Sequence, residues 1–188
     1  SFYVRFFDHE DIGRNLFQVT QQVEQQGSFL NRYDVTLLVN GLPLVQIELK
    51  RTGIEIKEAF NQVGRYHKHS FWTNHGLYYY VQVFVISNGV NTKYFSNQKE
   101  QSVKQTFFWA DTDNRNVTEL TDFAAIFLQP VFLGKFIAHY VVMEEAHKRM
   151  LVMRPYQVHA TEAIVKQVIA GKENGYIWHT TGSGKTLT

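Results

Sequence analysis

The sequence predicts an α/β fold: a mixed central sheet flanked by helices, followed by the first elements of a second unit that carries a phosphate-binding type of loop. Three observations indicate this. Residues 34–50 have the pattern of a β-hairpin, and residues 77–86 that of a strand buried on both faces. Residues 182–186 form a glycine-rich loop. Strands that alternate with helical segments are typical of α/β domains.

Composition restricts the class of protein. The 188 residues, 44% of them hydrophobic, suffice for one well-buried domain and a short remainder. A net charge of +2 permits nucleic-acid binding without requiring it. The chain has no cysteine, which excludes disulfides and thiolate metal sites. No apolar stretch approaches the roughly 20 residues that span a bilayer, and no signal peptide is visible. We therefore expect a cytoplasmic protein with no membrane partner.

The hairpin has the clearest sequence pattern in the chain. Residues 34–39 alternate as in a strand, Asn40-Gly41 is a strong turn signal, and residues 42–50 form the return strand, with Pro43 near its start. Alternation places Glu48 and Lys50 on one face and Leu49 on the other.

The length of the turn decides whether Asp34 can cooperate with Glu48. A two-residue turn would pair Asp34 with Ile47 and leave the two acids on opposite faces. A shared metal ion would then be impossible. We therefore predict a three-residue type I turn over 39–41, with Gly41 as a left-handed bulge residue.

The other elements follow from periodicity and from helix-stop signals. Thr52 to Glu55 fits a capping box for a helix that should run to about His69. The sequence further predicts a strand at 77–86, a short strand at 92–95, an irregular segment at 97–116, a helix at 119–129 stopped by Pro130, further helix within 131–149, a helix at 157–170 and a short strand at 176–179.

Asp34, Glu48 and Lys50 suit a Mg²⁺-dependent site for phosphodiester hydrolysis. Mg²⁺ prefers hard oxygen ligands, so Asp34 and Glu48 are candidate ligands, and Leu49 could add its backbone carbonyl. Lys50 could hold or deprotonate the attacking water and offset charge on the phosphoryl group. The alternative is that these are ordinary solvent-facing strand residues, but the apolar Val45 and Ile47 make the strand a poor setting for an unused acid.

Gln62 and Tyr66 lie four residues apart, so they share one face of the helix that follows the hairpin. We expect both to belong to the catalytic site, where Gln62 could position a DNA end or a phosphate. The alternative is an exposed glutamine beside a core tyrosine. Histidines such as His67, His69 and His75 fit no zinc pattern without cysteine.

The C-terminal loop has the end of a nucleotide-binding motif: Gly182, Ser183, Gly184, Lys185 and Thr186. Its backbone amides would cradle phosphates, Lys185 would reach the β- and γ-phosphates, and Thr186 would hold Mg²⁺. His179 stands where the strict motif has its first glycine. The loop predicts ATP as a cofactor.

Taken in order, Asp34, Glu48-Leu49-Lys50 and Gln62-x-x-x-Tyr66 resemble the PD-(D/E)xK nucleases that carry a Q-x-x-x-Y motif; Tyr33 replaces the proline of that pattern. Residues 32–51 resemble the restriction (motor and nuclease) subunit of type I restriction enzymes, as does the segment Trp178 to Gly182.

This resemblance implies a restriction-endonuclease-like domain at 1–150 and, at 151–188, the start of a RecA-like superfamily 2 helicase motor in which Gln157 reads adenine. It implies a type I site-specific deoxyribonuclease that cleaves double-stranded DNA, coupled in a longer protein to ATP-driven translocation, with a modification (methyltransferase) subunit and a specificity subunit as partners. The alternatives are a repair helicase-nuclease that degrades DNA from its ends, and a non-catalytic DNA-binding clamp.

Overall fold

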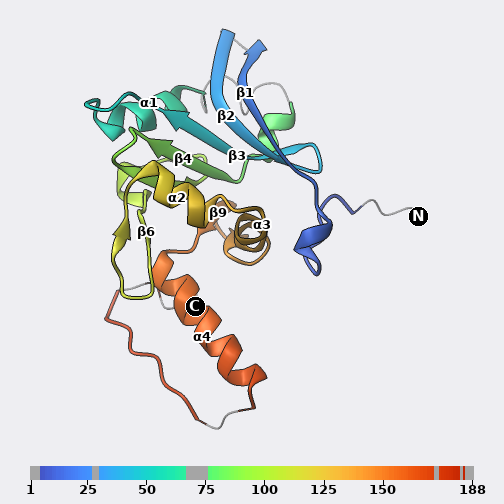
Figure 1. Cartoon of the computed structure of the whole chain (residues 1–188), viewed down its shortest axis with the longest axis vertical. Coiled ribbons are helices and arrows are strands. Elements are labelled where there is room, and N and C mark those ends of the chain that lie inside the picture. The colour runs from blue at the N-terminus through green and yellow to red at the C-terminus, as the bar shows by residue number, and fades with distance from the viewer. Residues whose placement is uncertain (1–4, 27–29, 67–75, 172–173, 183, 185–188) are drawn as a thin grey trace.

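The computed structural model describes residues 5–26, 30–66, 76–171, 174–182 and 184. Its centre is a five-stranded sheet in which the strands follow one another in chain order (Figure 1). The strands are β1 (Phe17–Gln26), β2 (Leu30–Val39), β3 (Leu42–Leu49), β4 (Val83–Ser87) and β5 (Thr92–Ser96). Neighbours are antiparallel except β3 and β4, which are parallel. The predicted mixed α/β sheet is confirmed.

The turn between β2 and β3 differs from the prediction. It contains only Asn40 and Gly41, whose φ angles of 51° and 83° are both left-handed, and Val39 pairs directly with Leu42. Asparagine and glycine adopt such angles at the least cost, which is why this dipeptide favours two-residue hairpin turns. The predicted three-residue turn is therefore wrong.

The extra residue lies within β3 instead. Leu38 pairs with Pro43 and Leu37 with Val45, so that Leu44 is left over as a β-bulge. The carbonyl of Leu44 accepts a hydrogen bond from the amide of Gln82 at 2.9 Å, so the bulged backbone is satisfied by the chain entering β4. The bulge shifts the pairing by one residue for the rest of the hairpin.

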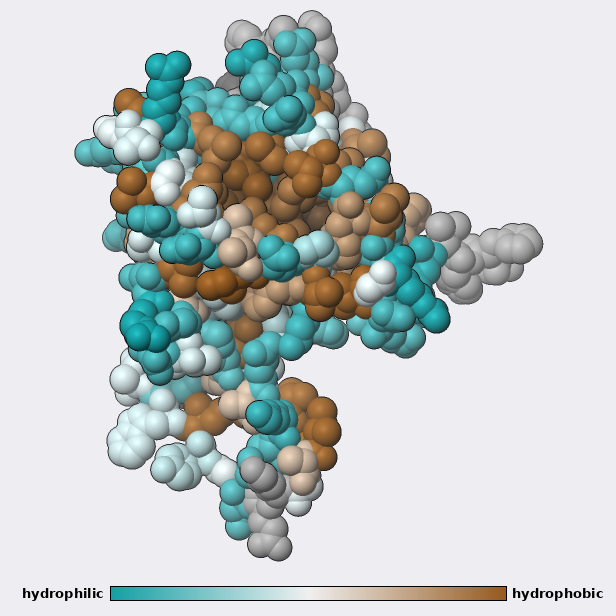
Figure 2. All heavy atoms as spheres, in the orientation of Figure 1, coloured by the Kyte–Doolittle hydropathy of each residue, from teal (hydrophilic) through white to brown (hydrophobic). Residues whose placement is uncertain are grey.

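Helices cover both faces of the sheet. On one face α1 (Ile56–Tyr66) packs through Ala59, Phe60 and Val63 against apolar residues of β4 and β5. On the other, α2 (Leu120–Phe127) and α3 (Pro130–His139) enclose an aromatic core. Its largest fully buried members are Tyr94, Trp109, Phe123, Phe127 and Phe136. Figure 2 shows apolar residues gathered across the upper middle of the molecule, below a hydrophilic upper end.

Several predicted elements need correction. Helix α1 begins at Ile56, and Thr52 lies in a turn, so it does not cap the helix. The 3₁₀ segment η3 (Leu77–Tyr80) replaces the first half of the predicted strand. Pro130 follows the predicted helix and lies in the first turn of α3. Proline is tolerated there because backbone N–H groups in the first turn have no acceptor within the helix.

Other corrections concern the region after α3 and the irregular segment. The segment after α3 forms a hairpin of β8 (Val141–Glu144) and β9 (Arg149–Val152) rather than helix. A second small hairpin joins β6 (Trp109–Ala110) to β7 (Asn116–Val117). Residues 176–179, predicted as a strand, have no regular secondary structure. The predicted helix end near His69 lies outside the described residues.

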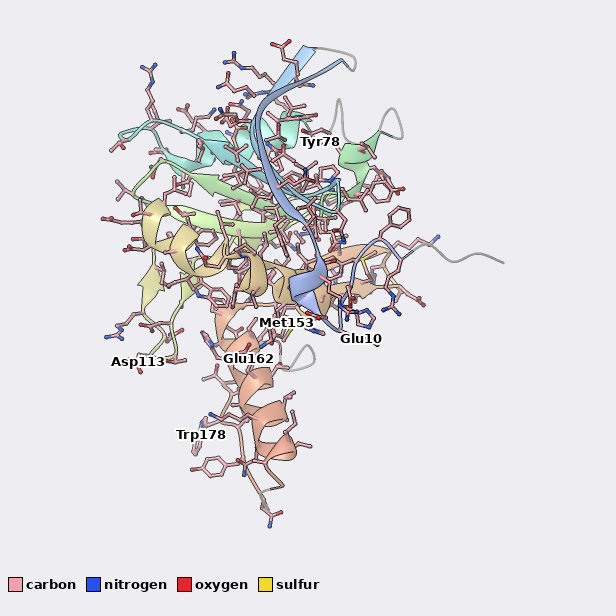
Figure 3. The ribbon with its side chains drawn as sticks, turned by 45° about the vertical axis from the view of Figure 1, so that its right-hand side comes forward. Glu10, Tyr78, Asp113, Met153, Glu162 and Trp178 are labelled. Atoms are coloured by element: carbon pink, nitrogen blue, oxygen red, sulfur yellow. The ribbon has the colours of Figure 1, made fainter. Side chains whose placement is uncertain are left out.

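Helix α4 (Pro155–Ile169) extends away from the sheet but is anchored to it (Figure 1). The Tyr94 hydroxyl donates to the carbonyl of Met153 at 2.8 Å, just before the helix. Farther along, Glu162 accepts a bond from Lys135 of α3 at 2.6 Å. Figure 3 places Met153 and Glu162 near this junction.

In the part of the chain described here, no single helix is long and apolar enough to cross a membrane. Helices α2 and α3 satisfy that test only as a pair, bent by 70° at the break between them.

Candidate active site

The bulge at Leu44 brings the two predicted acidic ligands together. Beyond it Val35 pairs with Ile47, so that Asp34 follows opposite Glu48. The amide of Leu49 donates to Oδ2 of Asp34 at 2.8 Å. The geometry therefore allows Asp34 and Glu48 to act together, as predicted. The extra residue that makes this possible lies in β3, at Leu44, and not in the turn.

Glu48 is the buried member of the pair. Its side chain has 0% exposure, and its Oε1 accepts a bond from the ammonium of Lys50 at 3.0 Å. Its Oε2 is also buried and finds no hydrogen-bond partner among the described residues. Burying a carboxylate oxygen without a partner is costly unless a ligand completes its environment.

Electrostatics follow from this placement. Burial raises the pKa of Glu48 to about 7; the Lys50 hydrogen bond and charge oppose the rise, and the nearby Asp34 carboxylate adds to it. A carboxylate that repels its neighbour and lacks a partner on one oxygen is a suitable ligand for a cation.

Lys50 is held from two directions. Its ammonium donates to Glu48, near the end of β3, and, in a short contact, to Oε1 of Gln62 on α1. These bonds use two of the three N–H groups of the ammonium, so that the third can be directed to a phosphate or a water. The side chain is only 22% exposed, which limits its freedom.

The remaining predicted residues are placed as follows. Gln62 meets Lys50, so its carbonyl oxygen is engaged with the catalytic candidate rather than directed outward. Tyr66 lies in the last turn of α1, but its side chain is outside the described part of the structure, as are His67, His69 and His75. Leu49 uses its amide on Asp34; a role for its carbonyl stays a prediction.

The donor set fits Mg²⁺. Two carboxylates from adjacent strands offer hard oxygen ligands, and one of their oxygens, Oε2 of Glu48, is buried with no partner among the described residues. Within the described ranges no group of three histidine, aspartate or glutamate residues gathers in the manner of a closed metal cage. Mg²⁺ commonly takes one or two carboxylates and completes its shell with water and substrate phosphate.

The glycine-rich loop is described only in part. Gly182 and Gly184 both have φ angles of +76°, which suits a tight loop, whereas Ser183, Lys185 and Thr186 lie outside the described residues. The buried Gln157 donates to the carbonyl of Gly184 at 2.8 Å and accepts from the amide of Arg154 at 2.8 Å.

A cavity of about 630 Å³ lies beside this loop. Its walls include Arg154, Tyr156, the stretch 177–182 and Asp111 of the β6–β7 turn. Gln157 and Gly184 line a separate, smaller pocket of about 140 Å³. The predicted adenine reader thus contacts the loop itself and does not face the larger cavity.

Comparison with known proteins decides the family. Residues 1–103 match the family described as the N terminus of the type I restriction enzyme R protein. The chain belongs to the type I restriction enzyme R protein family. Residues 150–188 of this R-protein chain also match the family described as the res subunit of type III restriction enzymes.

Named relatives of the R-protein chain agree. It is 50% identical over 187 residues to the endonuclease subunit of the type I restriction enzyme SauCOLORF180P from Staphylococcus aureus strain COL, covering 99% of the chain and 20% of that subunit. It is 48% identical over 168 residues to the EcoprrI endonuclease subunit of Escherichia coli, covering 88% of the chain and 53% of that protein. The chain thus spans about a fifth of the length of the staphylococcal relative.

Sequence reasoning passed over one set of polar residues beside the candidate site. Thr36 and Gln46 are buried between the strands, on the face that carries Glu48. The available signal was a pair of polar side chains inside otherwise apolar strands.

Proposed function

We propose that this chain is the nuclease part of a type I restriction subunit and hydrolyses phosphodiester bonds of double-stranded DNA with Mg²⁺. The observation that carries the proposal is the pairing of Asp34 with a buried Glu48 whose Oε2 has no partner in the described part of the chain, beside a fixed lysine. The proposed fold is restriction-endonuclease-like, with the domain ending near residue 150.

Asp34 and Glu48 would hold the metal ion, with the Leu49 carbonyl as a further ligand. The chemistry that bound Mg²⁺ supplies is polarisation of the phosphoryl oxygen and a more acidic water. The protein's own contribution is to place two negative charges where a cation relieves their repulsion, and to exclude water from one side of Glu48.

Lys50 would orient the attacking water or stabilise charge that develops on the phosphate. Its ammonium is fixed by Glu48 and Gln62, so little reorganisation is needed when the substrate arrives. Gln62 would act here by positioning Lys50, and Tyr66 would complete the same helix face.

The wider activity is proposed by analogy with the relatives, which are named endonuclease subunits of type I restriction enzymes. In a longer subunit the loop containing Gly182, Ser183, Gly184, Lys185 and Thr186 would bind ATP for DNA translocation, with Gln157 beside it. A modification subunit and a specificity subunit would supply target recognition. A match of residues 150–188 to a second restriction-enzyme family supports the motor assignment.

The decisive experiment compares the assembled enzyme with two aspartate variants. Asp34→Asn removes a metal ligand, whereas Asp113→Asn changes an exposed aspartate that pairs with Arg115 in the β6–β7 turn. Cleavage of circular DNA carrying the target should fall about a thousandfold in Asp34→Asn, equivalent to about 4 kcal/mol. The Asp113→Asn variant should cleave normally.

Unchanged cleavage in Asp34→Asn would refute the site assignment and favour a DNA-binding clamp in which the acids are structural. Faster digestion of linear than of circular DNA, progressing from the ends, would favour a repair helicase-nuclease instead.

A further inference from the structure

Tyr78 of η3 contacts β2 at a residue that precedes Asp34 and at a residue that follows it. Its ring lies 4.5 Å, centroid to centroid, from the ring of Tyr33, the residue before Asp34. Its hydroxyl lies 3.1 Å from Oγ1 of Thr36, two residues after Asp34. Figure 3 shows Tyr78 where η3 approaches the sheet.

The hydroxyl of Tyr78 begins a directed chain of hydrogen bonds. Thr36 donates its single hydroxyl proton to Oε1 of Gln46 at 2.7 Å, so Tyr78 must be the donor to Thr36. Gln46 then donates from Nε2 to the carbonyl of Ile47 at 3.3 Å. The chain ends one residue before Glu48.

All three side chains are removed from solvent. Their exposed fractions are 1% for Thr36, 0% for Gln46 and 9% for Tyr78. Burial raises the pKa of Tyr78, which keeps its hydroxyl protonated and able to donate. A buried polar network with its partners in place fixes one arrangement of the chain, because any slip leaves polar groups unpaired.

The three side chains lie next to the part of the hairpin where the pairing of β2 with β3 decides which residues share a face. Thr36 and Gln46 are direct cross-strand partners and form the second pair after the Leu44 bulge. Asp34 comes two residues before Thr36, and Glu48 two residues after Gln46, so the two pairs share one face of the sheet. A slip of one residue would move Asp34 and Glu48 to opposite faces.

We propose that Tyr78, Thr36 and Gln46 are positioning residues that hold Asp34 and Glu48 in register as a metal-binding pair. This inference rests on the proposed nuclease function and assigns the three residues no contact with substrate. The apolar residues of β2 and β3 stabilise the packing of the two strands. The hydrogen bonds from Tyr78 through Thr36 to Gln46 stabilise the one register that the bulge creates.

The test uses Thr36→Val and Tyr78→Phe, which remove hydroxyls while keeping the shape of the side chains, and Thr36→Ser, which restores a hydroxyl. The control is Thr106→Val, which removes a buried hydroxyl bonded to the carbonyl of Val103, away from the hairpin. Each is made in the assembled enzyme. Mg²⁺ affinity by calorimetry, kcat, KM for DNA and melting temperature are measured for all four variants.

Thr36→Val and Tyr78→Phe should weaken Mg²⁺ binding several-fold and lower kcat about tenfold, since misplacement of catalytic groups by a fraction of an ångström is enough for such losses. KM for DNA should be unchanged. Thr36→Ser should recover most of both values. Thr106→Val should lower the melting temperature by a similar amount and leave Mg²⁺ affinity and kcat as in the wild type.

Normal Mg²⁺ affinity and kcat in Thr36→Val and Tyr78→Phe, whatever their melting temperatures, would overturn the inference. Failure of the proposed function gives a different pattern, in which Asp34→Asn cleaves as the wild type does. The calorimetric affinity still decides on the positioning role in that case, because it requires no cleavage.

Discussion

The amide of Leu49 donates to Oδ2 of Asp34 across 2.8 Å, linking the strand of one acid to the backbone directly after the other. The bond is possible because the Leu44 bulge changes the pairing of β2 with β3 by one residue. Without the bulge, the two-residue turn at Asn40 and Gly41 would place Asp34 opposite Ile47. One unpaired leucine therefore determines whether Asp34 and Glu48 lie on the same face of the hairpin.

Glu48 should make the metal-free protein less stable at alkaline pH. Its pKa in the folded chain is about 7, against an ordinary value of 4.5. Because the folded-state pKa is the higher one, its stabilising effect is complete below pH 4.5 and is lost as the pH rises through 7. Over that interval the free energy of unfolding should fall by about 3 kcal/mol through this group.

Urea unfolding of the wild type and of Glu48→Gln without Mg²⁺ measures this contribution, since other titrating groups cancel in the difference. We expect Glu48→Gln to be the more stable protein at pH 8 by about 3 kcal/mol, with little difference at pH 4. Parallel curves for the two proteins across this range would show that Glu48 titrates normally. Added Mg²⁺ should stabilise only the wild type at pH 8.

Asp34→Asn should lower the pKa of Glu48. The Asp34 carboxylate raises that pKa through its charge and hydrogen bonding, but burial is the larger cause. We therefore expect the pKa in the variant to lie between the ordinary value of 4.5 and the wild-type value of about 7. Carboxyl carbon NMR titration of Glu48 measures it, and an unchanged midpoint would mean that the two carboxylates do not interact.

Gln62→Ala should act on catalysis through Lys50. The variant removes one of the two acceptors that hold the ammonium, so we expect kcat to fall about tenfold with KM for DNA unchanged. Lys50→Gln should lower kcat by about a hundredfold or more. If Gln62 instead binds a DNA phosphate, as its position in sequence first indicated, KM will rise while kcat holds.

Two glycine substitutions should shift stability in opposite directions. Gly41→Ala places a Cβ at a φ angle of +83° in the hairpin turn, and we expect a loss of about 1 kcal/mol. Gly64→Ala lies within α1, where an added Cβ meets nothing within 4 Å, and should stabilise by roughly 0.5–1 kcal/mol. Equal effects at both positions, measured by urea unfolding, would contradict the left-handed turn.

Much of the fold and site could be predicted because the signals were local. Alternation from Asp34, the Asn40-Gly41 turn and the helical periodicity of the segment after Glu55 are short-range patterns that tertiary structure did not override. Asp34 and Glu48 can share a face only if one extra residue interrupts the two-residue hairpin register between them. That extra residue was predicted from the need for both acids to bind one metal ion, and Leu44 is that residue.

The position of the bulge could not be predicted, because residues on either side of Leu44 are apolar in any register. Strand β1 escaped notice since glutamines dominate it and the left-handed Gln22 interrupts its alternation. The β8–β9 hairpin was read as helix because two four-residue strands are too short to show a period. The sequence placed Gln62 in the same site as Lys50, but their direct contact depends on how α1 packs on the sheet, which the sequence does not reveal.

Helix α4 is bonded to the core of the domain along its N-terminal half and extends away from the sheet (Figure 1). Tyr94 bonds to Met153 just before the helix, His159 lies 2.9 Å from the carbonyl of Ala110, and Lys135 bonds to Glu162 at the middle of the helix. Its 15 residues span about 22 Å. Such a helix is a lever: a displacement of about 2 Å at its far end turns its base by only about 5°. A displacement at the far end of α4 would therefore reach the hydrogen bond between Tyr94 and Met153 as a small rotation.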